Sequence, residues 1–175
     1  MAGAEASEKI AAAVRGLFDM PVGVGVTIPG QAHPPLMAGE AAPLTRARPA
    51  RVAEFTAGRH AARLAMRELG HAPQRVLTAP DRAPVWPPGL VGSISHSAHW
   101  CLAVVAEAGT CRAIGIDIED DTPLAEDLAA EVCSPAERAE STPFHGAKGV
   151  FCAKEAAYKA QYPLTRALFG FDGLA

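Results

Sequence analysis

Two carboxylates stand two residues apart in the segment 112–119, Arg-Ala-Ile-Gly-Ile-Asp-Ile-Glu. The alternation predicts a strand, with Ile114, Ile116 and Ile118 on one face. Asp117 and Glu119 then share the other face, where their charges repel each other. A divalent cation removes this repulsion, and Mg²⁺ prefers one or two protein carboxylates together with substrate phosphates. The alternative interpretation is a strand that runs into an ordinary acidic turn, because Asp120 and Asp121 follow at once.

A third carboxylate lies in the segment 150–161, which predicts a helix. Glu155 and Lys159 are i,i+4 neighbours on that helix, as are Lys154 and Tyr158. Taken alone, a Glu–Lys pair of this kind is usually an exposed surface pair. If the helix faces the paired carboxylates, three acidic and two ammonium groups together make a magnesium–phosphate site.

Hydroxyl groups and an imidazole gather in the segment 92–97, Gly-Ser-Ile-Ser-His-Ser. At the end of a strand, Ser95 and His96 suit phosphate recognition by hydrogen-bond donors. A Ser–His nucleophile pair is less favoured, because the chain lacks a Gly-x-Ser-x-Gly elbow. A zinc site on His96 and His99 is also weak, because no third ligand has a suitable spacing.

Arginines offer a second way to hold a phosphate. Arg51 and Arg59 lie near the start of the clearest predicted helix and can grip an anion. Arg82, in the turn before Trp86, can join them. The other two arginines of this helix are interpreted as a solvated basic face: Arg63 and Arg67. Because the chain has neither a P-loop nor a dinucleotide-binding glycine motif, a phosphorylated ligand must be held by side chains and metal.

Composition limits the class of protein. The 175 residues are 49% hydrophobic and 20% charged, with a net charge of −3, which excludes wholesale disorder and a strongly basic nucleic-acid binder. The longest apolar run, 100–106, is far too short to span a membrane. Glu5 and Glu8 precede any apolar stretch, so no targeting segment is expected. Four cysteines without a C-x-x-C spacing indicate free thiols and the reducing cytoplasm.

Both helices and strands are predicted to position these residues. An apolar stripe of Val52, Phe55, Ala62, Met66 and Leu69 predicts the 51–69 helix. The other predicted helices are 5–18, 124–133, 135–141 and 150–161. The predicted strands are 22–28, 91–95, 100–106 and 112–119. The most natural seam lies near Gly109, which divides the chain into residues 1–109 and 110–175.

Four segments appear in a characteristic order. They are Arg-Val-Ala-Glu-Phe-Thr-Ala-Gly-Arg-His (51–60), Trp-Pro-Pro-Gly-Leu-Val-Gly-Ser-Ile-Ser-His-Ser (86–97), Gly-Ile-Asp-Ile-Glu (115–119) and Phe-Cys-Ala-Lys-Glu-Ala-Ala-Tyr-Lys-Ala (151–160). Together they resemble the 4′-phosphopantetheinyl transferases of the surfactin-synthetase-activating and enterobactin type, in particular the actinobacterial enzymes. The resemblance implies a pseudo-dimer of two similar α/β halves with a coenzyme A site in the cleft between them. It implies transfer of 4′-phosphopantetheine from coenzyme A to a serine of an apo acyl or peptidyl carrier protein.

The resemblance also assigns roles by motif. Asp117, Glu119 and Glu155 would bind Mg²⁺, or Mn²⁺, with the pyrophosphate. The 3′-phosphate and adenosine end would be held by Arg51, Arg59, Ser95 and His96, joined by Arg82. The pyrophosphate would face Lys154 and Lys159, with Tyr158 on the same helix face. Glu155 is also a candidate for the general base, and the sequence does not decide between this role and metal binding.

Two departures from the family pattern leave alternatives open. Relatives usually continue past the helix at 150–161, so the C-terminal half is expected to be incomplete at Ala175. The stretch 141–149 is also unlike the family. The alternatives are an inactive homologue that binds coenzyme A or a carrier, and a Mg²⁺-dependent hydrolase of coenzyme A or a nucleotide. A site built from two fused halves predicts a monomer. From the composition, neither a nucleic acid nor a membrane is expected as a partner.

Overall fold

The computed structural model describes residues 2–140 and 146–174. Its central layer is an antiparallel sheet in the order β1-β5-β4, with strands β1 (Gly23–Thr27), β5 (Cys101–Glu107) and β4 (Leu90–His96). β5 lies in the middle and is apolar because both of its faces are covered. The register pairs Ser95 with Leu102 and His96 with Cys101, which puts both polar residues at one end of the sheet.

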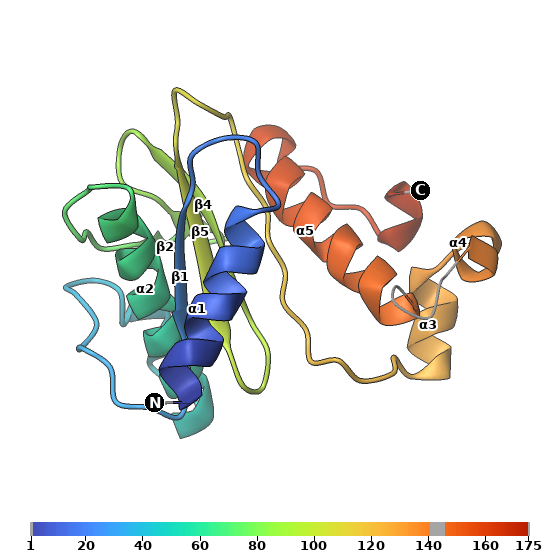
Figure 1. Cartoon of the computed structure of the whole chain (residues 1–175), viewed down its shortest axis with the longest axis horizontal. Coiled ribbons are helices and arrows are strands. Elements are labelled where there is room, and N and C mark those ends of the chain that lie inside the picture. The colour runs from blue at the N-terminus through green and yellow to red at the C-terminus, as the bar shows by residue number, and fades with distance from the viewer. Residues whose placement is uncertain (1, 141–145, 175) are drawn as a thin grey trace.

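Helices cover the two faces of this sheet (Figure 1). α2 (Pro49–Glu68) packs on the face that presents Ala103 and Val105. α1 (Ala2–Arg15) packs on the opposite face, over Leu102 and Val104. Successive residues of β5 therefore belong to two separate apolar clusters, as the period of two along a strand requires.

Small residues set the distance between α2 and the sheet. A Cβ atom on Gly25 of β1 would lie 1.9 Å from the carbonyl oxygen of Ala61, so the two backbones touch. The alanines of α2 form this contact, and Ala61 and Ala65 are fully buried. The predicted apolar stripe of this helix is therefore wrong at Val52, which is 36% exposed. The helix turns its smallest side chains toward the sheet, because the two backbones approach so closely.

The remaining elements follow or flank this core. Along the chain, a short hairpin of β2 (Leu77–Thr78) and β3 (Pro84–Val85) follows α2 and precedes β4. The C-terminal part holds α3 (Glu126–Val132), α4 (Pro135–Glu140) and α5 (Ala147–Thr165). Figure 1 shows α3 and α4 beside the N-terminal end of α5. The two 3₁₀ turns are η1 (Ala42–Leu44) and η2 (Phe171–Gly173).

The predicted helices are confirmed, as are the first three predicted strands. α5 is longer than expected and contains Pro163. The unusual stretch 141–149 lies partly outside the described residues, because residues 141–145 are not among them.

The predicted strand at 112–119 is wrong. The segment runs extended beside β4, but serine hydroxyls take the place of ladder carbonyls. The amide of Ile116 donates to Ser93 Oγ at 3.1 Å, and the amide of Ile118 donates to Ser95 Oγ at 3.4 Å. Ile114 is buried as the alternation requires. The alternation of side chains along this segment was therefore predicted correctly, although the segment forms no backbone hydrogen-bond ladder.

The fold is mixed α/β, as expected. Within residues 108–140 and 146–174, the structure has helices and extended chain but no strand, so the similarity of the two halves stays a prediction. None of the described helices is both long and apolar enough to cross a membrane.

His60 of α2, which packs against His33, is expected to make folding sensitive to pH. The ring of His60 lies 5.4 Å from the ring of His33. Burial, followed by the neighbouring His33 and Arg63, lowers the pKa of His60 from 6.5 to about 4. Between these values the unfolded chain binds a proton that the folded chain does not, so stability falls as the pH falls.

We expect His60 to account for roughly 2–3 kcal/mol of lost unfolding free energy as the pH falls from 7 to 4.5. Replacing His60→Gln removes this titration and flattens the dependence. Urea unfolding of both proteins across this range measures it. Parallel curves for the two proteins would refute the assignment.

Candidate active site

A cavity of about 370 Å³ lies where α2, the β2–β3 hairpin, β4, the 112–119 segment and α5 meet. Nine residues proposed from the sequence line it: Arg51, Arg59, Arg82, Ser95, His96, Asp117, Glu119, Glu155 and Lys159. The basic residues come mainly from α2 and the hairpin. Three carboxylates come from the 112–119 segment and α5, and a fourth, Glu54 of α2, lies beside Arg51. The fold thus brings an anion-binding wall and an acidic wall into one space.

Asp117 is the centre of the acidic wall. Its side chain is only 5% exposed, and its Oδ1 accepts from Lys159 Nζ at 2.5 Å and from Ser95 Oγ at 2.6 Å. Lys159 also donates to Ser95 Oγ at 3.1 Å. The other carboxylate oxygen, Oδ2, is buried and has no hydrogen-bond partner. A buried anionic oxygen without a partner is costly, so this atom is suited to a cation.

The two glutamates extend the acidic wall. Glu119 Oε2 lies 3.4 Å from the Lys148 ammonium group. Burial raises the pKa of Glu155, the charges of Asp117 and Glu119 raise it further, and Lys159 opposes this. Glu155 therefore releases its proton less readily than an ordinary glutamate until a cation offsets the negative charge.

The acidic wall fits a magnesium ion chemically. Among the described residues, no three His, Cys, Asp or Glu side chains stand close enough together to form a finished metal site. The lysine ammonium on Asp117 already supplies positive charge there. The donor set is nonetheless the one Mg²⁺ uses, namely carboxylate oxygens in an open cavity with room for phosphate and water.

Arg59 is the most buried cation of the opposite wall. Its guanidinium carbon lies 4.2 Å from the centre of the Phe55 ring, and Nη2 donates to Thr78 Oγ1 at 2.9 Å. Burial lowers the pKa of Arg59 to about 10, so the group remains charged at neutral pH. Its buried Nε has no hydrogen-bond partner. An anion entering the cavity would supply one.

Arg51 and Arg82 complete the basic wall. Arg51 Nη1 lies 2.9 Å from His96 Nε2 and 3.2 Å from Glu54. Since an arginine only donates, His96 is the acceptor of this hydrogen bond. Arg82 occupies the hairpin turn with a φ of +72°, a left-handed conformation that is uncommon outside glycine.

The hairpin is held to α5 beside this turn. Asp81 accepts from Arg166 at 2.7 Å and from Tyr162 Oη at 2.9 Å. The strained turn that presents Arg82 is therefore fixed from the C-terminal end of α5.

Two predicted site residues do not line this cavity. Lys154 is 6% exposed and donates to Glu137 and to the carbonyl oxygens of Val132 and Phe171, each at 3.0 Å. The expectation that it faces the pyrophosphate therefore disagrees with its position. The reason is helical phase: Lys154 and Tyr158 share one face of α5, and Glu155 and Lys159 share another. Tyr158 stacks on Tyr162 and borders a neighbouring cavity.

Lys154 ties α5 to α3, α4 and η2, so its loss should act on stability. For Lys154→Met we expect a decrease of about 1–3 kcal/mol in unfolding free energy, because Glu137 and two carbonyls lose a buried donor. Lys148→Met, which removes a longer and less buried ion pair, is the matched control and should cost less than about 1 kcal/mol. Urea unfolding followed by circular dichroism distinguishes them. Equal midpoints for the two variants would contradict this role.

Cysteine chemistry is not favoured in the cavity. Burial raises the pKa of Cys101 to about 11, and burial together with the Asp117 charge raises the pKa of Cys152 to about 12. Both thiols stay protonated at neutral pH and are poor nucleophiles.

Sequence reasoning missed several residues around the cavity. Glu54 lies one turn after Arg51 and Phe55 one turn before Arg59 on α2, and Phe151 lies one turn before Glu155 on α5. Their helical spacing from the proposed residues could have identified them. Arg63, interpreted as solvated, is 4% exposed and pairs with the buried Glu40 at 3.0 Å. Glu40 is the only charged residue from 20 to 45, which is the signal that could have marked it.

The comparisons with known proteins agree with this geometry. Residues 39–106 match the family model of the 4′-phosphopantetheinyl transferase N-terminal domain. Residues 113–175 match the model of the 4′-phosphopantetheinyl transferase superfamily. The two matched regions contain the two walls of the cavity.

Individual relatives include two 4′-phosphopantetheinyl transferases and an enterobactin synthase component. The 4′-phosphopantetheinyl transferase PptT of Mycobacterium tuberculosis is 40% identical over 124 residues, which cover 68% of this chain and 55% of PptT. Svp of Streptomyces mobaraensis is 39% identical over 140 residues, 76% of this chain and 57% of Svp. Enterobactin synthase component D of Salmonella typhimurium is 43% identical over 121 residues, 63% of this chain and 48% of the relative. The chain spans about half the length of these relatives.

Proposed function

This chain belongs to the 4′-phosphopantetheinyl transferase superfamily, and from this premise we propose that it transfers the 4′-phosphopantetheine group of coenzyme A to a serine of an apo acyl or peptidyl carrier protein. The products are the holo-carrier and adenosine 3′,5′-bisphosphate. One observation carries the proposal: a single cavity has carboxylates from the C-terminal part on one wall and arginines from the N-terminal part on the other. Such a site suits a ligand with several phosphates and a metal.

The basic wall binds the adenosine end of coenzyme A in this proposal. Arg51, Arg59 and Arg82 hold the 3′-phosphate, with Ser95 and His96 as further hydrogen-bonding groups. The unpartnered Nε of Arg59 supports this role, because a phosphate oxygen would satisfy it.

The acidic wall holds the magnesium ion. Asp117, Glu119 and Glu155 are the proposed ligands, and the unpartnered Oδ2 of Asp117 supports this assignment. When bound, Mg²⁺ supplies positive charge that stabilises the pyrophosphate as it breaks. Lys159 is proposed to face the same pyrophosphate, which requires its ammonium group to leave or share Asp117. Mn²⁺ satisfies the same ligands.

The reaction is a phosphoryl transfer with a balanced exchange of bonds. The carrier serine oxygen attacks the β-phosphorus, and the bond from that phosphorus to the bridging oxygen breaks. The electron pair goes to the departing adenosine 3′,5′-bisphosphate. Glu155 is one candidate to take the serine proton, since its raised pKa favours proton uptake. Lys154 is left out of this proposal because it is engaged elsewhere.

We also propose that residues 1–109 and 110–175 correspond to two halves of a pseudo-dimer with the site between them. The gap between the two family matches, after residue 106 and before residue 113, supports this seam. A site completed within one chain supports a monomer. The four unpaired cysteines favour the cytoplasm as its location.

Intact-mass spectrometry tests the proposal. The chain is mixed with Mg²⁺, coenzyme A and a panel of apo carrier proteins, with Glu155→Gln as the control. The expected result is one added phosphopantetheine group on a carrier, lost with a chelator and in the control. Cleavage of coenzyme A without a carrier would instead indicate a hydrolase. Binding of coenzyme A without turnover would indicate a binding module.

A further inference from the structure

A carboxylate with no contact to the cavity lies fully buried behind its basic wall. Glu40 has an exposed fraction of zero, and both of its oxygens are engaged. Arg63 Nη1 donates to Oε1 at 3.2 Å and to Oε2 at 3.0 Å. The amide of Val76 donates to Oε1 at 2.9 Å, and the amide of Met37 donates to Oε2 at 2.7 Å. A charge buried this deeply is tolerated only when its partners are held in place.

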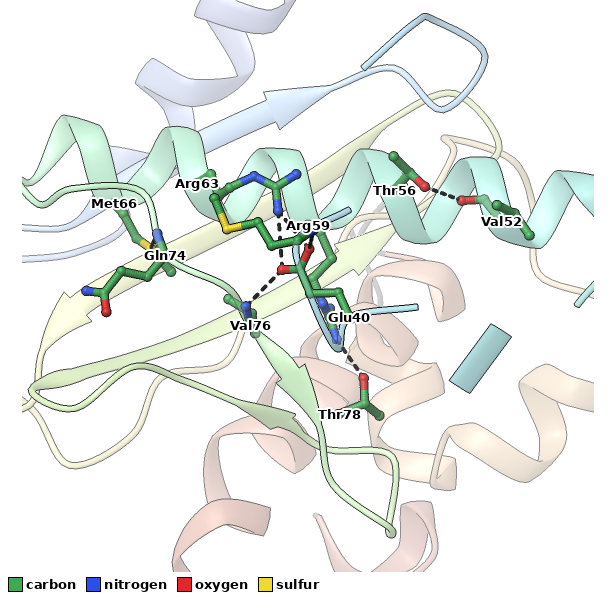
Figure 2. Close-up of polar contacts among 10 residues, drawn as sticks. Glu40, Val52, Thr56, Arg59, Arg63, Met66, Gln74, Val76 and Thr78 are labelled. Atoms are coloured by element: carbon green, nitrogen blue, oxygen red, sulfur yellow. Dashed lines mark hydrogen bonds and ion pairs between the residues drawn. The ribbon is translucent and has the colours of Figure 1, made fainter. Parts of the chain in front are cut away.

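Two of the three partners of Glu40, Arg63 and Val76, belong to the segments that present the arginines (Figure 2). Arg63 lies one helical turn after Arg59 on α2, so the ion pair fixes this part of the helix. Val76 immediately precedes β2, which carries Thr78 and leads into the hairpin turn at Arg82. Glu40 thus joins the helix of one proposed phosphate-binding arginine to the hairpin of another.

Thr78 closes this network at the cavity. Its Oγ1 accepts from Arg59 Nη2 at 2.9 Å, two residues after the amide that Glu40 holds (Figure 2). Burial lowers the pKa of Arg59, and the Glu40 charge opposes this effect. The hydrogen bond from Arg59 to Thr78 holds the guanidinium at the cavity wall, and the Glu40 charge favours its protonated form.

We propose that Glu40 is a positioning residue that sets Arg59 and, through Val76 and Thr78, the hairpin of Arg82 for recognition of the 3′-phosphate of coenzyme A. This inference rests on the proposed function, since it takes coenzyme A as the ligand. Glu40 touches neither ligand nor reacting atoms. Its effect is selective, because the arginines that it orients recognise one phosphate of the ligand.

The test compares the dissociation constants of coenzyme A and 3′-dephospho-coenzyme A, measured by isothermal titration calorimetry with Mg²⁺ present. The full chain should bind coenzyme A more tightly, and the ratio of the two constants measures recognition of the 3′-phosphate. In Glu40→Gln we expect this ratio to fall about tenfold, a typical loss when a supporting contact is removed. A variant that only folds less completely would have fewer binding sites, but the ratio of the two dissociation constants would stay the same.

Two further variants keep the test valid if Glu40→Gln folds poorly. The double variant Glu40→Gln/Arg63→Met removes both buried charges together, which proteins often tolerate. Thr78→Val keeps the buried pair and removes only the hydroxyl that holds Arg59. Both should lower the ratio. Glu68→Gln, on the far end of α2, is the matched control and should keep the wild-type ratio.

The possible results distinguish a failure of the proposed function from a failure of the positioning role of Glu40. A wild-type chain that binds neither compound overturns the proposed function and the positioning role with it. Binding by the wild type, with an unchanged ratio in the folded Glu40 variants, overturns the positioning role alone. An equal fall in the Glu68→Gln control would also overturn it, since the loss would then be general.

Discussion

Asp117→Asn should reduce the rate of the proposed phosphopantetheine transfer at least about 100-fold, since substituting even a group that only supports a metal ligand costs 10–100-fold. Asparagine keeps the size of the side chain but loses its charge, and its amide nitrogen cannot bind a cation. The buried, unpartnered Oδ2 is the atom that the cation would use. The loss should therefore appear in the response to Mg²⁺.

The measurement is the initial rate of carrier modification at increasing Mg²⁺ concentration. A second measurement does not depend on activity: the rise in melting temperature that Mg²⁺ and coenzyme A produce in the wild type, which should shrink in the variant. Asp120→Asn is the matched control, because Asp120 lies three residues further on and pairs with His99 at 3.0 Å outside the cavity. A wild-type response to Mg²⁺ in Asp117→Asn would rule out Asp117 as a metal ligand.

Local spacing made the pairing of Asp117 with Glu119 and of Glu155 with Lys159 predictable, whereas the family resemblance implied that the separate segments meet at one site. Asp117 and Glu119 share a side of an extended segment whether or not a ladder forms, so the error about the strand did not move them. Ser95 and His96 end a strand whose apolar alternation was clear. The sheet and α2 were predictable for the same reason, since their patterns repeat over several turns or residues.

What sequence reasoning missed depends on contacts between distant segments. Lys154 carries the same charge as Lys159, and only the packing of α3 and η2 around it shows that its ammonium group is buried. Arg63 was expected to be solvated, because nothing near it in sequence indicates a carboxylate. Its partner Glu40 lies 23 residues away in a proline-rich loop. Such pairs are fixed by tertiary structure and leave no periodic signal.

The second large effect is expected from a residue without a side chain. A Cβ atom on Gly115 would lie 1.9 Å from the carbonyl oxygen of Ala156 and 2.7 Å from the amide nitrogen of Ala160. Both are backbone atoms of α5, so a larger residue cannot be accommodated by a rotamer change. Gly115→Ala should therefore displace α5 from the 112–119 segment.

This displacement should affect stability and the site together. We expect a decrease of about 1–3 kcal/mol in unfolding free energy, the usual cost of forcing extra volume into a packed interior. Because α5 carries Glu155 and Lys159, their alignment with Asp117 should be lost as well. Binding of coenzyme A in the presence of Mg²⁺ should then weaken by at least about tenfold, even at temperatures where the variant is folded.

Gly109→Ala is the matched control, because a Cβ atom there meets no atom within 4 Å. Urea unfolding and calorimetric binding of coenzyme A are measured for both variants. If Gly115→Ala behaves like Gly109→Ala in both measurements, α5 is not held at the distance that the structure shows. If only stability falls and binding of the folded protein is unchanged, the contact supports the fold but does not align the acidic wall. A joint loss means that the absence of one side chain in the 112–119 segment determines where α5 places its carboxylate and its lysine.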